Sequence, residues 1–130
     1  MSVELVSIAV LSITLLLTTL AQGSLVPIIH GFKWGLGSRD EPVTETALQG
    51  RFTRCVRNQI EAIAIYAPIA TMVVSLDRTC EMSAVAAWLV VAGRVLFVPF
   101  YLGGVFGLRS AAYGMATLGV LIMSFCLIYG

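Results

Sequence analysis

Four polar residues recur at helical spacing in one short segment of an otherwise apolar chain. They are Arg51, Arg54, Asn58 and Glu61, separated by three, four and three positions. At about 100° per residue, these positions fall within about 80° of one another, so a helix presents them on one face. The planar guanidinium fork of arginine matches the geometry of carboxylates and phosphates. This polar stripe therefore predicts a binding site for an anionic ligand.

A second group of functional candidates lies in the apolar segment that follows. Arg94, Phe97 and Tyr101 are separated by three and four positions, so they also share one helical face. Facing the polar stripe, this helix would complete a cavity lined by arginines, an amide, a carboxylate and a phenol.

The charges of the polar stripe need partners, because a charged side chain at bilayer depth costs at least about 2.5–3.5 kcal/mol unless it is paired or hydrated. We expect Glu61 to pair with Arg94, or with Arg57 one helical turn before it. Such pairs could serve only to set the register of the helices. Arg51 and Arg54 could instead contact the headgroups of anionic lipids.

The composition of the chain places these residues in a membrane protein. Of 130 residues, 58% are hydrophobic and 12% are charged, and the charged fraction of soluble domains is about twice as high. The net charge of +1 gives no basic surface for nucleic acid, so no nucleic-acid partner is expected. The spacing of the three cysteines matches neither a disulfide framework nor a zinc site, and we expect small apolar packing residues at these positions. They are Cys55, Cys80 and Cys126.

Four segments could form membrane-spanning helices, each of which needs about 20 mostly apolar residues. Their approximate bounds are 3–29, 57–76, 82–106 and 111–129. The second must begin near Arg57, since its apolar run is short, and it therefore carries Asn58 and Glu61 to membrane depth. Ser110 is a candidate N-cap for the last helix. With one polar loop, 30–50, and short turns elsewhere, the sequence predicts a single domain that is an all-α, antiparallel four-transmembrane-helix bundle.

The basic residues predict the orientation of this bundle in the membrane. Arg78 is the one basic residue on the face that holds both termini, and six lie on the opposite face. Those six are Lys33, Arg39, Arg51, Arg54, Arg57 and Arg109. Because basic residues concentrate in cytoplasmic loops, we expect loop 30–50 in the cytoplasm and both termini on the non-cytoplasmic side.

The motifs at these positions resemble the MAPEG family, the membrane-associated proteins of eicosanoid and glutathione metabolism. The segment from Arg51 to Glu61 reads R-x-x-R-x-x-x-N-x-x-E, which resembles the family signature at the second helix. The segment from Gly93 to Tyr101 is similar to the family pattern G/A-R-x-x-Y-x-x-x-Y, and Arg109 follows at the start of the fourth helix. The loop Gly37–Pro42 is similar to that of bacterial members, so the resemblance extends over essentially the whole chain and implies a bacterial inner membrane, with an organelle membrane as the alternative.

This resemblance implies a homotrimer of four-helix subunits, with ligand sites between neighbouring subunits near the cytoplasmic face. It also implies glutathione as a co-substrate. The positions that would hold the tripeptide are Arg54, Asn58 and Glu61, with Arg51 as an outer carboxylate contact and with Arg94 and Tyr101 in the same pocket.

The resemblance makes Arg109 the catalytic residue, which would stabilise the glutathione thiolate. A free thiol has a pKa near 8.5, and a guanidinium beside it lowers that value. A shift of one pKa unit, about 1.4 kcal/mol, gives about ten times more thiolate. Such a thiolate would attack an apolar electrophile or a lipid hydroperoxide dissolved in the bilayer.

Three functions remain open on the sequence alone. The first is a glutathione-dependent transferase or peroxidase of the membrane. The second is a non-catalytic binding or accessory subunit of a larger membrane complex, which is favoured by Phe97 in place of the first tyrosine of the family pattern and by Ala62 after the glutamate. The third is a small transporter, which usually needs an ionisable residue deep in the membrane, whereas Glu61 is expected to pair with arginines.

Overall fold

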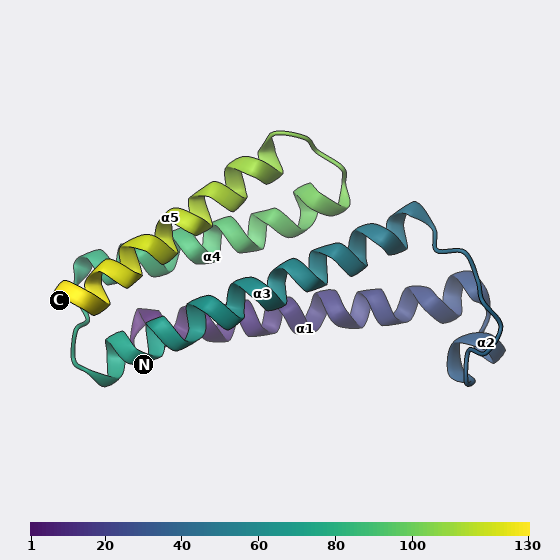
Figure 1. Ribbon diagram of the computed structural model, residues 1–130, viewed down its shortest axis with the longest axis horizontal. Helices are drawn as coiled ribbons and strands as arrows, with labels where there is room; N and C mark the ends of the chain where they lie inside the picture. The colour runs from purple at the N-terminus through teal and green to yellow at the C-terminus, as the bar shows by residue number, and fades with distance from the viewer.

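The computed structural model describes residues 1–130 and is entirely helical, which confirms the predicted all-α class (Figure 1). Of the three connections between the four long helices, two are short turns, and the first is a longer loop that contains one short helix. The helices are α1 (Val3–His30), α2 (Phe32–Leu36), α3 (Ala47–Ser75), α4 (Glu81–Leu102) and α5 (Leu108–Tyr129).

Helix α3 begins well before the predicted membrane segment 57–76, and its N-terminal turn explains why. Thr46 is the N-cap, and its hydroxyl accepts a hydrogen bond from the backbone N–H of Gln49 at 3.2 Å. The Gln49 side chain accepts in return from the Thr46 N–H at 2.9 Å, which completes a capping box. All four residues of the polar stripe therefore belong to one continuous helix.

The turn between α4 and α5 differs from the sequence expectation at both ends. Helix α4 ends at Leu102 rather than Phe106, because Gly103 caps it and Gly104 takes a left-handed conformation with φ of 68°. Helix α5 begins at Leu108 with Gly107 as its N-cap, so the prediction that Ser110 caps this helix is wrong. A glycine with φ of 82° provides the turn, and Ser110 lies inside the first helical turn.

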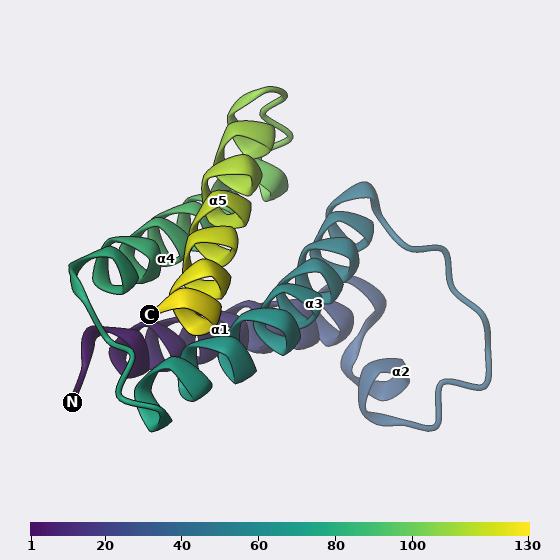
Figure 2. The ribbon, with the colours of Figure 1, turned by 60° about the vertical axis from the view of Figure 1, so that its left-hand side comes forward.

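The long helices alternate in direction and form two antiparallel pairs, α1 with α3 and α4 with α5 (Figures 1 and 2). The two pairs lie close together at the end of the molecule that holds both termini. They diverge toward the other end, where α2 and its loop lie (Figure 2). The polar stripe of α3 lies at this diverging end.

The core sits between the two pairs and fixes their crossing. It is formed by Leu11 of α1, by Tyr66, Ala70 and Val73 of α3, by Ala86, Ala87 and Val90 of α4, and by Met123 of α5. Helices α4 and α5 approach closely at two glycines. A Cβ at Gly93 would lie 2.6 Å from the Ala112 carbonyl oxygen, and one at Gly119 would lie 2.7 Å from that of Ala86. Side chains at these two positions would push the helices apart.

Three helices, α1, α4 and α5, are long and apolar enough to span a membrane. Helix α3 is long enough but carries the polar stripe in its first half. Large apolar side chains are exposed along all four long helices, and 24 of the 130 residues are buried in the single chain. This surface suits a lipid environment, where apolar side chains need not be buried inside the protein.

Candidate functional site

A buried arginine joins α3 to α4 near the middle of the bundle. Arg94 is 2% exposed, and its Nε donates a hydrogen bond to Gln59 Oε1 at 2.9 Å. One of its terminal nitrogens donates to Asn58 Oδ1 at 2.6 Å. The Gln59 amide donates in turn to the Arg94 carbonyl at 3.1 Å. We call Asn58, Gln59 and Arg94 the Arg94 cluster. It contains no carboxylate to neutralise the arginine, but its buried polar atoms all have hydrogen-bond partners. Polar groups buried in a medium of low dielectric constant need such partners.

The expected pairing of Arg94 with Glu61 is therefore wrong. Gln59 and Glu61 are two positions apart, which is about 200° around the helix. Because Gln59 faces Arg94 on α4, Glu61 points away from α4. Glu61 and Arg57 are both exposed on the single chain. Two neutral amide acceptors hold the buried guanidinium in place of the expected carboxylate.

Three residues of the predicted site meet at the diverging end of the bundle. Arg54 of α3 donates from Nε to the hydroxyl oxygen of Tyr101 on α4 at 3.0 Å. The guanidinium carbon of Arg109 on α5 lies 5.3 Å from the centre of the same tyrosine ring, within cation–π distance. Tyr101 thereby links two cationic side chains from helices that are distant in sequence.

Arg51 lies one helical turn further toward the end of the bundle and caps α4. Its guanidinium donates to the Leu102 carbonyl at 3.2 Å, one of the carbonyls that the end of a helix leaves without a partner. A Cβ at Gly104 would lie 3.3 Å from this guanidinium. The structure therefore places Arg51 beside the site and gives it a structural contact.

A pocket of about 240 Å³, which we call the polar pocket, opens between α3, α4 and α5 at this end, and its lining combines polar side chains with aromatic rings. None of the side chains that line it is acidic, and Arg109 supplies its positive charge. The lining residues are Asn58, Phe97, Tyr101, Arg109, Ser110 and Tyr113. Of the predicted site residues, Asn58, Tyr101 and Arg109 line this pocket, Arg54 and Arg94 contact its lining, and Glu61 stays apart.

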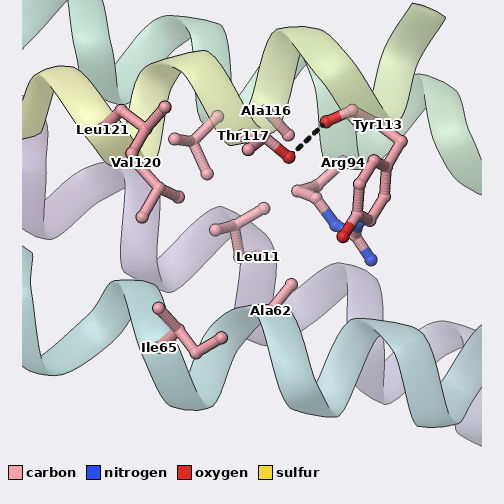
Figure 3. Close-up of a pocket in the computed structure, with 10 residues that line it drawn as sticks. Leu11, Ala62, Ile65, Arg94, Tyr113, Ala116, Thr117, Val120 and Leu121 are labelled. Atoms are coloured by element: carbon pink, nitrogen blue, oxygen red, sulfur yellow. Dashed lines mark hydrogen bonds between the residues drawn. The ribbon is translucent and has the colours of Figure 1, made fainter. Parts of the chain in front are cut away.

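An apolar pocket of about 220 Å³ lies next to the polar one, between the two helix pairs (Figure 3). Leu11, Ala62 and Ile65 face Val120 and Leu121 of α5 across it. Arg94 and Tyr113 stand together at one end, with the tyrosine ring beside the guanidinium (Figure 3). Because Tyr113 lines both pockets, it marks the boundary between the polar and the apolar space.

Sequence reasoning missed two residues of this arrangement, Gln59 and Tyr113. Gln59 is 1% exposed. It is a polar residue in a predicted membrane segment, where a side-chain amide needs a hydrogen-bond partner, and this requirement could have identified it from the sequence. Tyr113 lies four positions after Arg109, one turn along the same helix face. Its ring centre is 6.5 Å from that of Phe97, and both rings line the same pocket.

One of three comparisons with known proteins identifies a family. The model of the MAPEG family matches residues 6–129, nearly the whole chain. A search of curated proteins and a search of solved structures each found no match.

Proposed function

This chain belongs to the MAPEG family of membrane proteins, and from that membership and two adjoining pockets we propose a glutathione-dependent transferase or peroxidase. Its substrates would be hydrophobic electrophiles or lipid hydroperoxides that reach the protein through the bilayer. The observation that carries the proposal is the contact between a cationic polar pocket and an apolar pocket at Tyr113. A reaction between a water-soluble anion and a lipid-soluble partner needs two such compartments side by side.

The polar pocket has the chemistry to hold an anionic tripeptide. Glutathione carries two carboxylates, and the guanidinium groups of Arg54 and Arg109, which make this end of the site positively charged, both contact Tyr101. The pocket lining contains no acidic side chain that would compete for these cations. Arg51, beside the pocket at the end of α4, would contact an outer carboxylate.

Arg109 would act on the thiol. Bound glutathione supplies the nucleophilic sulfur, and a guanidinium beside a thiol stabilises the anion and lowers its pKa. Arg109 stands at the start of α5, where unpaired backbone N–H groups add to the positive potential. Its position over the Tyr101 ring restrains it without using its hydrogen-bond donors on a carboxylate.

The apolar pocket would hold the second substrate close to this thiolate. In the transferase reaction, sulfur forms a bond to an electrophilic carbon and the leaving group departs with its electron pair. In the peroxidase reaction, two glutathione thiols reduce one hydroperoxide to an alcohol and water and are oxidised to one disulfide. Arg94 and Tyr113 at the inner end of the pocket would orient the polar group of either substrate.

A second copy of the chain would complete the site. Glu61 is exposed on α3, and a charge at that depth costs at least about 2.5–3.5 kcal/mol when it faces lipid. The polar pocket of about 240 Å³ is also smaller than the roughly 300–1,000 Å³ of ordinary ligand pockets. A homotrimer would cover Glu61 and give the tripeptide its outer wall.

A non-catalytic accessory subunit is the second candidate, and the Arg94 cluster favours it. Asn58, an expected ligand contact, is already engaged as an acceptor for Arg94 at 2.6 Å. Phe97 also lacks the hydroxyl of the family pattern. If these groups serve only to join helices, the protein would bind a partner in a larger membrane complex without turnover.

A turnover assay in liposomes separates the two functions. Purified protein is given glutathione with a chlorodinitrobenzene or with a fatty-acid hydroperoxide, and conjugate or alcohol is measured. The enzyme is expected to produce at least one of them, and Arg109→Ala is expected to lose that activity while it keeps the wild-type oligomeric state. Absence of both products from protein of native size would contradict the enzyme function and support the accessory subunit.

A further inference from the structure

Two cysteines lie side by side at the end of the molecule opposite to the candidate site. Cys80 is the N-cap of α4, and Cys126 lies in the last turn of α5. Their Sγ atoms are 3.9 Å apart, although 46 positions separate them in sequence. Cys80 is exposed, whereas Cys126 is 1% exposed and Cys55 is buried elsewhere.

The surrounding contacts hold these sulfurs together. Arg78, two residues before Cys80, donates hydrogen bonds to the carbonyls of Leu127 and Ile128 and so ties the turn between α3 and α4 to the end of α5. The Cys80 N–H donates to Ser83 Oγ at 2.9 Å, which fixes the first turn of α4. The contact between the two sulfurs thus follows from backbone anchors on both sides.

The exposed member of the pair has the character of an attacking thiol. Hydrogen bonds from backbone N–H groups at the start of α4, first that of Ser83, lower the pKa of the Cys80 thiol. The thiolate is the reactive form, and solvent can reach it. Cys126 is shielded from solvent, and the one cysteine whose sulfur it contacts is Cys80.

We propose that Cys80 and Cys126 form a redox-active thiol pair that closes to a disulfide between the N-terminus of α4 and the C-terminus of α5. A disulfide needs about 2.05 Å between its sulfurs, so they must approach by nearly 2 Å. Rotation of the exposed Cys80 side chain would bring its sulfur toward that of Cys126. The pair is separate from the glutathione pocket and does not depend on the function proposed for it.

The oxidant is a small disulfide, of which glutathione disulfide is the simplest. The Cys80 thiolate attacks one of its sulfurs, which forms a mixed disulfide and releases one glutathione thiolate. The Cys126 thiol then loses its proton and attacks the Cys80 sulfur, which releases the second glutathione thiolate. In total, two protein thiols are oxidised, one disulfide is reduced, and two glutathione molecules leave. The basic residues predict that this end of the bundle lies on the non-cytoplasmic side, where such disulfides persist.

The pair is tested by mass spectrometry of the full chain. Reduced protein in detergent is incubated with glutathione disulfide, denatured, alkylated and weighed. The wild type is expected to lose two of its three alkylatable thiols and to retain no glutathione. The Cys126→Ser variant is expected to stop at the mixed disulfide and to retain one glutathione on Cys80. The Cys55→Ser variant is the matched control, and it is expected to form the same internal disulfide as the wild type.

Two results would overturn the proposal. One is a wild-type protein that keeps glutathione on Cys80 to the same extent as Cys126→Ser, since the second cysteine then resolves nothing. The other is a wild-type protein whose three thiols all remain free under conditions that oxidise a dithiol peptide. A peptide map that shows a disulfide between Cys80 and Cys126 would support the proposal and is incompatible with both of these results.

Discussion

Arg94 shows how a cation can be buried in this bundle without a counter-ion. Its guanidinium donates to the neutral side chains of Gln59 and Asn58, and the Gln59 amide returns a hydrogen bond to the Arg94 backbone. Hydrogen bonds to charged groups contribute about 1.5–3 kcal/mol each, and a buried acceptor left without its donor adds a penalty. The Arg94 cluster should therefore dominate the stability of the α3–α4 contact.

A double-mutant cycle tests this interaction. We expect Arg94→Ala to lower the free energy of unfolding in detergent by at least about 2 kcal/mol. In combination with Gln59→Ala, the two effects should be non-additive by about 0.5–3 kcal/mol, because both substitutions remove the hydrogen bond between Arg94 Nε and Gln59 Oε1. Thr79→Ala, in the exposed turn before α4, is the control: its effect on the free energy of unfolding should add to that of Arg94→Ala. Additivity in the first pair would contradict the hydrogen bonds described here.

Arg54 offers a test of the ligand site that spares the thiol chemistry. Arg54→Ala removes a guanidinium that donates to Tyr101 at the edge of the polar pocket. Loss of one carboxylate contact should weaken glutathione binding about tenfold, or about 1.4 kcal/mol, as measured by calorimetry. Lys33→Ala removes the same charge from the loop region away from this pocket and should leave the affinity unchanged. Equal effects of the two substitutions would mean that only net charge matters.

At this scale, the sequence could predict the candidate residues but not their partners. Helical spacing indicated Arg54 and Tyr101, the family resemblance indicated Arg109, and the structure brings these three residues together. The partner of Arg94 depended on which side of α3 faces α4. A polar stripe about 80° wide does not determine how α3 is rotated about its axis, because Gln59 lies only about 100° around the helix from its neighbour Asn58.

At the scale of elements, helix types were predictable and helix ends were not. Apolar runs predicted the positions of all four long helices, although the run in α3 is shorter than a membrane span, and hydropathy does not detect a helix that continues past the membrane. The capping box of Thr46 and Gln49 starts α3 in polar sequence. Likewise, α5 begins after Gly107 and not at Ser110. The turn before α5 requires a positive φ, which glycine adopts without strain, and this requirement outweighs the benefit of a serine cap.

Glycine spacing sets the distance between α4 and α5, and this can be tested at two similar positions. Gly93→Ala would place a Cβ 2.6 Å from the Ala112 carbonyl oxygen, so we expect a loss of about 1–3 kcal/mol in stability. Gly114→Ala, on the partner helix with nothing within 4 Å of its Cβ, should have no destabilising effect. Thermal unfolding in detergent measures both, and equal effects would contradict the close packing at Gly93.

At the scale of the whole molecule, the proposed homotrimer would cover what the single chain leaves exposed. Two helix pairs diverge toward the end that carries the candidate site, and Glu61 is exposed on α3 (Figure 2). Sequence could indicate the membrane and the family. It could not predict this divergence, which results from packing in the core at the other end of the bundle.

The orientation in the membrane can be measured with the exposed thiol of Cys80. In reduced spheroplasts, a membrane-impermeant maleimide should label Cys80 from outside, since both it and the termini lie at one end of the bundle. A Ser38→Cys substitution in the opposite loop, made in a Cys80→Ser background, should react only after the membrane is opened. The reverse labelling pattern would contradict the orientation predicted from the basic residues.

The most direct test of the proposed function is a glutathione titration followed by ultraviolet difference spectroscopy. The protein should generate a saturable thiolate absorbance near neutral pH, where free glutathione is almost wholly protonated. Arg109→Ala should bind glutathione and keep its native size, but should lose this absorbance. A wild-type protein that gives no thiolate signal at saturating glutathione, or an Arg109→Ala variant with an undiminished signal, would contradict the assignment of this pocket as a thiolate-forming site.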